Sequence, residues 1–323
     1  MKPRKRVLLT VSPGLVAGRR YMTQRSLVTT LHARADLLVV PAGEYDFATA
    51  RVHAYRRVAR GRFQSIGLVP AAADLWIVYS DGYYLDHRAL GFDKRRDFLR
   101  AQLEFHQRRV DAGAVGRLVN EPQAEARTLK SWFAKLNAEA YGVIPTRVFS
   151  SIGDVYDFRK DQDAVVAKLD WGGNGAGARR LRTDDDVQRF EQELASSTDR
   201  ELRDYCFQPY LPGDETRLWF VGGRFVAGRI SRGRATPWSG STPDYEIRPY
   251  DASCAHGAAA DIQAAERLFR RSRLEVGSVD LIGARINEIN GCGTIFTEYR
   301  NWDCIVDARP ALTKYFVDLL KSL

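Results

Sequence analysis

The sequence lacks the features that mark disulfide-rich, zinc-binding and membrane proteins. Its 323 residues contain four cysteines and no C-x-x-C pair, so we expect neither a disulfide framework nor a structural zinc site. No apolar run approaches the roughly 18 residues of a membrane-spanning helix. The basic start is followed by an apolar run only from Val7 to Val11, too short for the roughly 7–15-residue core of a signal peptide. We therefore expect a cytoplasmic protein with no membrane partner.

Neither sign of charge is concentrated in one block, and no repeat or low-complexity tract interrupts the chain. The formal net charge is +9, but the arginines are spread along the whole length. Such an excess is compatible with nucleic acid, an anionic membrane or an acidic small molecule as partner. Its even spread favours a solvated surface with an anion-binding pocket.

The first third predicts an α/β domain with a parallel sheet. Short apolar runs closed by Gly or Pro alternate with stretches compatible with helices, which is typical of parallel strands. The runs lie at 6–12, 37–40 and 75–79, and the helical stretches at 21–33 and 93–112.

The pattern changes after residue 118. Asn120 and Pro122 predict the start of a helix that reaches Tyr141 and stops at Gly142. The remainder predicts short strands and turns, and the segment 231–252, rich in Gly, Ser, Pro and Arg, is the best candidate for a mobile loop. The expected elements are strands at 164–169, 178–181 and 206–211, a helix at 183–194, and hairpins at 217–226 and 279–289.

Three polar residues in the last predicted hairpin form a candidate metal site. Glu288 and Asn290 are two apart on a strand, so their side chains share a face, and Asp280 on the partner strand can reach it. Carboxylate and amide oxygens suit Mg²⁺ that bridges nucleotide phosphates. A polar strand face on the surface is the alternative, but the flanking Leu281 and Ile289 argue against exposure.

A glycine-rich stretch lies between two predicted strands at 172–177. It lacks the Lys-Ser/Thr of a P-loop, and its glycines do not follow the G-x-G-x-x-G spacing of a dinucleotide fold. It offers instead a flexible loop whose backbone N–H groups can lie on phosphates. Lys168, on the strand that enters the loop, would place a cation beside the same phosphates.

Two further segments carry weaker signals. The predicted strand that begins at Cys206 ends in a kink, and Pro209 keeps one of its edges from being paired further, so that edge can hydrogen-bond an adenine. Arg217 and Arg229 lie on neighbouring strands, and two arginines in one cleft would suit an anionic transition state.

Taken together and in order, these motifs resemble those of the ATP-grasp superfamily, with bacterial glutathione synthetase and the ribosomal-protein glutamate ligases as the nearest likenesses. The resemblance covers about 120–300. It implies an ATP-grasp fold, in which two α+β subdomains (119–201 and 202–323) clasp ATP, preceded by an α/β N-terminal domain with a parallel sheet (1–118). Glu215 stands where the family usually has Asp, and Leu169 where it often has Pro.

The resemblance also implies a role for each matching residue. ATP would be bound by Lys130, Lys168, Gly172, Gly173, Gly175, Gly177, Gln208, Tyr210, Leu211 and Glu215. Arg217 and Arg229 would be catalytic, and Mg²⁺ would be held by Asp280, Glu288 and Asn290. Two alternatives stay open: Asp214 in place of Glu215 at the ribose, and Lys135 in place of Lys130 at the phosphates.

The function implied is that of an ATP- and Mg²⁺-dependent carbon–nitrogen ligase that joins a carboxylate to an amine through an acyl phosphate. Its substrates would be amino acids, a small peptide or a natural-product precursor, and a homo-oligomer is left open. A kinase of the same fold, which stops at phosphoryl transfer, is one rival. The rival from another class, a basic nucleic-acid-binding protein, is disfavoured because the lysine, glycine-loop and Glu-x-Asn motifs occur in the ATP-grasp order.

Overall fold

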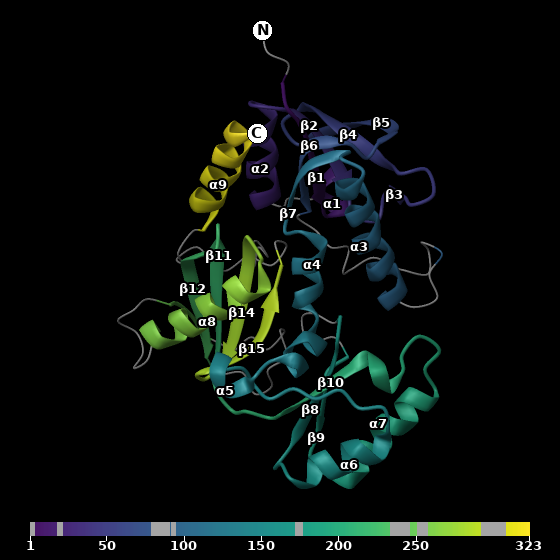
Figure 1. The fold of residues 1–323 in the computed structure, drawn as a ribbon, viewed down its shortest axis with the longest axis vertical. Helices are drawn as coiled ribbons and strands as arrows, with labels where there is room; N and C mark the ends of the chain where they lie inside the picture. The colour runs from purple at the N-terminus through teal and green to yellow at the C-terminus, as the bar shows by residue number, and fades with distance from the viewer. Residues whose placement is uncertain are drawn as a thin grey trace.

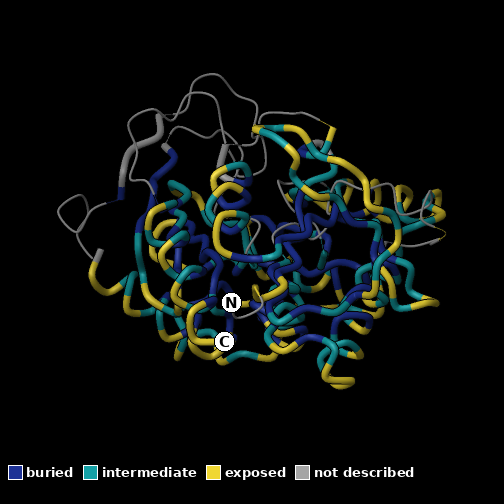
Figure 2. Tube along the Cα trace, turned by 90° about the horizontal axis from the view of Figure 1, so that it is seen from above, coloured by how far each residue is buried: buried dark blue, intermediate teal, exposed yellow. Residues whose placement is uncertain are grey.

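The computed structural model describes residues 4–17, 22–78, 91, 95–171, 177–232, 246–250, 258–291 and 308–323. They form three β-sheets with helices packed on them (Figure 1). Viewed from above, buried stretches of chain run through the interior and exposed stretches lie at the periphery (Figure 2). None of the described helices is long and apolar enough to cross a membrane.

The N-terminal sheet has a parallel centre, as predicted, because β1 pairs in parallel with β2 and β6, and β6 with β7. Its strands are buried on both faces. Val7 and Leu9 pack with Leu27 of α2, whereas Leu8 packs with Phe105 of α3 on the other side. The elements are β1 (Arg6–Val11), α1 (Pro13–Val16), α2 (Met22–His32), β2 (Asp36–Pro41), β6 (Ala73–Val78), α3 (Arg95–Asp111) and β7 (Val115–Val119).

An antiparallel extension of this sheet was not predicted from the sequence. The short β3 (Tyr45–Asp46) pairs with β4 (Arg51–Ala59), and β4 forms a hairpin with β5 (Arg62–Pro70). The sequence of the hairpin is polar because it has five arginines between residues 51 and 62, yet Val52 and Ala54 are fully buried. One face is therefore in the core and the other carries the charge.

The single helix predicted from Asn120 to Tyr141 is wrong. Asn120 has a left-handed φ of 57°, and its side-chain oxygen accepts the backbone N–H of Glu275 at 2.9 Å. Farther on, the backbone N–H of Ser131 donates to the carboxylate of Asp170 at 2.7 Å, which breaks the helical pattern. The stop at Gly142 is confirmed by its left-handed φ of 66°. The segment folds as α4 (Pro122–Glu125), η1 (Ala126–Thr128), η2 (Lys130–Lys135) and α5 (Ala138–Tyr141).

The other two sheets contain the strands and hairpins predicted beyond residue 160. A side-chain cap from Thr183 begins helix α7, as its sequence indicates. The three-stranded sheet comprises β8 (Val165–Leu169), β9 (Arg179–Leu181) and β10 (Tyr205–Pro209), with α6 (Ile152–Lys160), α7 (Asp184–Ala195) and η3 (Leu202–Asp204). The five-stranded sheet comprises β11 (Glu215–Val221), β12 (Arg224–Arg232), β13 (Glu246–Pro249), β14 (Val276–Ile282) and β15 (Arg285–Asn290), followed by α9 (Arg309–Ser322).

Two packing arrangements bear on the division of the chain into domains. Strand β10 pairs with β8, so it belongs to the three-stranded sheet although it follows the expected subdomain boundary at 201/202. Helix α9 returns to lie beside α2 (Figure 1), and its Leu312 and Phe316 join the N-terminal core. We therefore propose a subdomain boundary after Pro209, and the division at 118/119 stays a prediction.

Candidate active site

Four charged residues form a row across the five-stranded sheet. Arg217 on β11 is opposite both Arg229 on β12 and Asp280 on β14. Asp280 is in turn opposite Glu288 on β15. Because directly opposed residues in antiparallel strands share a face, all four side chains lie on the same side of the sheet. The expectation that Arg217 and Arg229 are neighbours is confirmed.

The other face of this sheet is apolar, and its burial determines to which side the charged side chains point. Leu218, Val279 and Ile289 are buried there against Leu268 and Phe269 of helix α8 (Ala258–Ser272). Strands alternate their side chains between faces, so burying these residues turns the charged ones toward the three-stranded sheet. The fold thus holds the row between two sheets.

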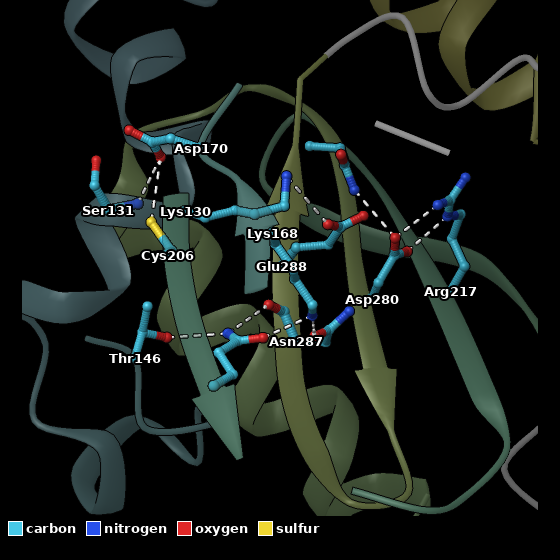
Figure 3. A network of polar contacts seen from close by, with 12 residues as sticks. Lys130, Ser131, Thr146, Lys168, Asp170, Cys206, Arg217, Asp280, Asn287 and Glu288 are labelled. Carbon is cyan, nitrogen blue, oxygen red and sulfur yellow. Dashed lines mark hydrogen bonds and ion pairs between the residues drawn. The ribbon is translucent and has the colours of Figure 1, made fainter. Parts of the chain in front are cut away.

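A bulge in β15 adds Asn287, which the sequence analysis missed. Asp280 is opposite Glu288 but Leu281 is opposite Ile286, so Asn287 is an extra residue in its strand. It therefore lies on the same side as Glu288 instead of alternating with it (Figure 3). The signal in the sequence was the spacing of the buried isoleucines on this strand, which are three residues apart and not two.

Arg217 and Asp280 form a bidentate ion pair. The Nε and Nη2 of Arg217 each donate to a carboxylate oxygen of Asp280 at 2.6 Å (Figure 3). The side chains are 14% and 3% exposed, so the pair is largely shielded from water. Burial raises the pKa of Asp280, and Arg217 opposes that rise without cancelling it. Burial acts to lower the pKa of Arg217, but Asp280 raises it above its ordinary value.

Glu288 lies against Lys130, at 3.6 Å between Oε2 and Nζ. Burial acts to raise the pKa of Glu288, but Lys130 and then Lys168 hold it below its ordinary value. Glu288 is therefore ionised, and the two lysines are its counter-charges. The rival Lys135 is exposed on η2, so the geometry favours Lys130 as the lysine of this site.

Lys168 is held by two amide side chains. Its ammonium donates to Oε1 of Gln208 at 2.6 Å and to the side-chain oxygen of Asn287 (Figure 3). Gln208 is itself fixed by a bond to Thr146 at 3.0 Å. Burial lowers the pKa of Lys168 to about 8, although Glu288 acts to raise it. The side chain of Gln208 thus positions Lys168.

Asp170 joins the lysine-bearing segment η2 to the three-stranded sheet. Its carbonyl accepts the N–H of Lys130 at 3.3 Å, and its carboxylate accepts the N–H of Ser131 at 2.7 Å. Cys206 lies beside the same carboxylate at 3.8 Å; it is a free buried thiol, and burial raises its pKa. The thiol of Cys206 is therefore held in its protonated form.

Arg229 is 4% exposed and contacts two side chains of the same sheet. Its Nη2 lies 3.5 Å from Oε1 of Glu215, and its Nη1 donates to Ser231 at 2.5 Å. Asp214, the alternative to Glu215, accepts the N–H of Gly283 through its backbone carbonyl at 3.1 Å. Glu215 is thus the carboxylate that joins the charged row.

The glycine-rich loop is described only at its end. Gly172, Gly173 and Gly175 lie outside the described residues, as does most of the segment 231–252. Gly177 has a left-handed φ of 73°, and a Cβ there would lie 2.4 Å from Leu169. Only glycine fits both requirements, so the loop returns tightly against β8.

The segment expected at the adenine carries an aromatic contact. The guanidinium of Arg180 lies 3.4 Å from the ring centroid of Tyr210, which indicates a cation–π interaction. The N–H of Tyr210 donates to Ala164 at 2.8 Å, so Tyr210 continues the pairing of β10 with β8. Leu211 follows and is half-buried.

The residues at the charged row fit a magnesium ion. Asp280 and Glu288 bring carboxylates to paired positions, and the amide of Asn290 lies 3.2 Å from Asp280. The described residues contain no group of three or more His, Cys, Asp or Glu side chains arranged to hold a metal. Two carboxylates and one amide suit Mg²⁺, which keeps several waters or phosphate oxygens as its other ligands.

Comparisons with protein-family models and with curated proteins find no match to this chain. Solved structures match it along nearly the whole length. The ATP-grasp ligase PsnB, complexed with a minimal precursor, has a TM-score of 0.61 at 18% identity and covers 97% of both chains. D-cycloserine synthetase DcsG has a TM-score of 0.61 at 17% identity and covers 98% of this chain and 99% of its own.

A third similar structure is the macrocyclase MdnC from Microcystis aeruginosa MRC, bound with its precursor peptide MdnA. Its TM-score is 0.60 at 14% identity, with 97% of this chain and 99% of MdnC covered. The chain therefore has the ATP-grasp fold, which confirms the fold predicted from its motifs.

Proposed function

We propose that this protein is an ATP- and Mg²⁺-dependent ligase that joins a carboxylate to an amine through an acyl phosphate. The observation that carries the proposal is the concentration of ionised groups between two sheets. Each carboxylate there lies against a cation, which is the environment that a magnesium nucleotide and an anionic intermediate require. They are Lys130, Lys168, Arg217, Arg229, Glu215, Asp280 and Glu288.

The neighbours in fold support this assignment. PsnB has been solved with a precursor, Mg and ADP, and with a precursor peptide and AMPPNP. In this chain, Lys130 and Lys168 would hold the phosphates, and the glycine-rich loop would cover them. The backbone of 208–211 would bind the adenine, and Glu215 the ribose.

Asp280, Glu288 and Asn290 would hold Mg²⁺, which would supply positive charge to neutralise the phosphates of the nucleotide. Arg217 has five N–H groups and uses two of them on Asp280. Three remain, so Arg217 can keep Asp280 in place and hold an anionic oxygen of the substrate at the same time. Arg229 would stabilise the developing charge from the next strand.

The substrate class follows from the same neighbours. PsnB and MdnC were solved with precursor peptides, and DcsG is named for a natural product. We infer a peptide or natural-product precursor as the carboxylate donor, with ADP as the nucleotide product. The protein residues would position and neutralise the reactants, with little covalent participation.

The test is incubation of the protein with ATP, Mg²⁺ and pools of acids and amines, followed by mass spectrometry. We expect an amide, with ADP and phosphate released in equal amounts. With hydroxylamine in place of the amine, we expect a hydroxamate, because hydroxylamine attacks the acyl phosphate. A stable phosphorylated product without amide, across a broad panel of amines, would instead identify a kinase.

A further inference from the structure

The β4–β5 hairpin is the most basic strand pair of the molecule that the function above does not use. Its twenty residues, 51–70, contain five arginines and no aspartate or glutamate. A further cation lies beside its turn, because a Cβ at Gly61 would lie 3.6 Å from the guanidinium of Arg25. This end of the N-terminal sheet therefore presents a concentrated positive charge.

The hairpin also lies at one edge of its sheet. β5 pairs with β4 through two register shifts, one of which leaves Ile66 without a directly opposite residue, and no other described strand pairs with its outer edge. Figure 1 shows β5 at the periphery of the N-terminal domain, far from β14 and β15. A strand at an edge presents unpaired N–H and C=O groups to which a further strand can bond. In β5, the carbonyl of Leu68 already accepts a bond from Arg51 at 2.6 Å, and the N–H of Gly67 donates to the hydroxyl of Ser65 at 3.2 Å, so a further strand would use the other main-chain groups.

Exposed aliphatic side chains gather on the same hairpin. Val58, Ile66 and Leu68 are 57%, 39% and 48% exposed, and they are three of the five exposed large hydrophobic residues in the described part of the chain. The aromatic residues of the hairpin are placed differently, since Tyr55 and Phe63 pack against the core. The outer surface thus combines aliphatic side chains with arginines and has no exposed aromatic ring from this hairpin.

Neighbouring acids neutralise only part of this charge. Arg56 lies 3.2 Å from Asp36, and His53 lies 3.0 Å from Glu44. Arg60 and Arg62 are exposed and form no ion pair with any described residue. Two cations at the turn are therefore available to an anionic partner.

We propose that the outer edge of β5 binds an extended, acidic peptide as an added strand. Bonds to the main-chain groups of β5 outside these side-chain contacts would give affinity, and apolar side chains of the peptide would lie on Ile66 and Leu68. Carboxylates of the peptide would meet the arginines at the turn. Binding of a single-stranded nucleic acid commonly uses exposed aromatic rings on which its bases stack, and the hairpin packs its rings against the core.

The proposal goes beyond the ligase chemistry and does not depend on it. In a peptide-modifying enzyme, such a surface would hold one part of the substrate while another part reaches the active site. Tethering of this kind raises the effective concentration of the reacting segment without any new contact at the site.

The test is a binding titration with the full chain and no nucleotide. The probe is a fluorescein-labelled ten-residue peptide in which Glu alternates with Val, followed by fluorescence anisotropy. We expect saturable binding that weakens about tenfold or more in the double variant Arg60→Glu, Arg62→Glu, because reversed charges repel the peptide. We expect a similar loss in Ile66→Glu, Leu68→Glu, and no change in the control Arg267→Glu on the exposed face of α8.

Each remaining outcome overturns the proposal. No binding, or binding that both double variants leave intact, would show that β5 does not bind the peptide. The arginines would then serve to prevent other strands from pairing with this edge. Equal binding of a peptide with Lys in place of Glu would exclude charge recognition. Tighter binding of single-stranded DNA, lost on charge reversal but kept in Ile66→Glu, Leu68→Glu, would identify a nucleic-acid surface. Sedimentation showing self-association through β5 would identify a second copy as the partner.

Discussion

The five-stranded sheet and the N-terminal sheet bury polar side chains in opposite ways. In the first, Arg217, Asp280 and Glu288 lie largely shielded from water, each against an opposite charge. In the second, His106 is 4% exposed among the rings of Tyr45 and Trp76. Burial lowers the pKa of His106 to about 3, so its ring is neutral at physiological pH.

The difference shows what keeps a buried group charged. A charge removed from water is costly unless a partner of opposite sign is close, whereas a lone group avoids the cost by losing its proton. The first arrangement keeps ions available for a charged ligand, and the second contributes only to the fold. Substitutions in the two regions should therefore differ in kind.

The largest expected effect comes from breaking the buried ion pair. Asp280→Ala leaves Arg217 buried without its partner, so we expect the free energy of unfolding to fall by about 3–5 kcal/mol. Unfolding in urea measures this free energy. Asp318→Ala, which removes the exposed pair with Lys314, is the matched control and should cost less than about 1 kcal/mol. Equal losses in the two variants would show that burial does not set the strength of the first pair.

The next largest effect is expected on catalysis. Arg229→Ala should lower turnover by about 10²–10³-fold while ATP still binds, because one charge-stabilising donor is lost. Steady-state rates measure the turnover, and calorimetric titration with ATP measures the binding. Arg224→Ala, at an exposed position of the same strand, is the control. A variant that loses ATP binding and turnover together would place Arg229 at the nucleotide instead.

A smaller effect is expected for the metal. Glu288→Gln keeps the shape of the side chain but removes one carboxylate, so turnover at limiting Mg²⁺ should fall on the order of 10–100-fold. The measurement is the dependence of rate on Mg²⁺ concentration, with circular dichroism as the check on folding. Rates close to those of the unaltered protein would remove Glu288 from the metal site.

The smallest expected effect is a change in how steeply the free energy of unfolding depends on pH. The pKa of His106 is lower in the folded protein than its usual 6.5, so the unfolded chain binds more protons between pH 6.5 and 3. Its contribution to stability is complete above pH 6.5 and is lost as the pH falls, by about 1.4 kcal/mol per unit. His106→Leu should flatten urea stability against pH in this range. An unchanged slope would contradict a neutral buried imidazole.

Much of the site could be predicted from the sequence, because its residues follow local patterns. The hairpin at 279–289 and the period of two along a strand were enough to bring Asp280, Glu288 and Asn290 together. The hairpin around Gly222 likewise made Arg217 and Arg229 neighbours. Alternation and turn residues act over a few positions, so they can be recognised without knowing the rest of the fold.

Other features were decided only by contacts between distant segments. Bonds to Asp170 broke the helix expected at 120–141, and packing placed Lys130 beside Glu288 while Lys135 stays exposed. A bulge against β14 brought Asn287 to the site. The sequence by itself determined which residues alternate, turn and carry charge. Which of them meet was settled by the packing of the sheets, because hydrogen bonds and burial between remote residues outweigh local helix preference.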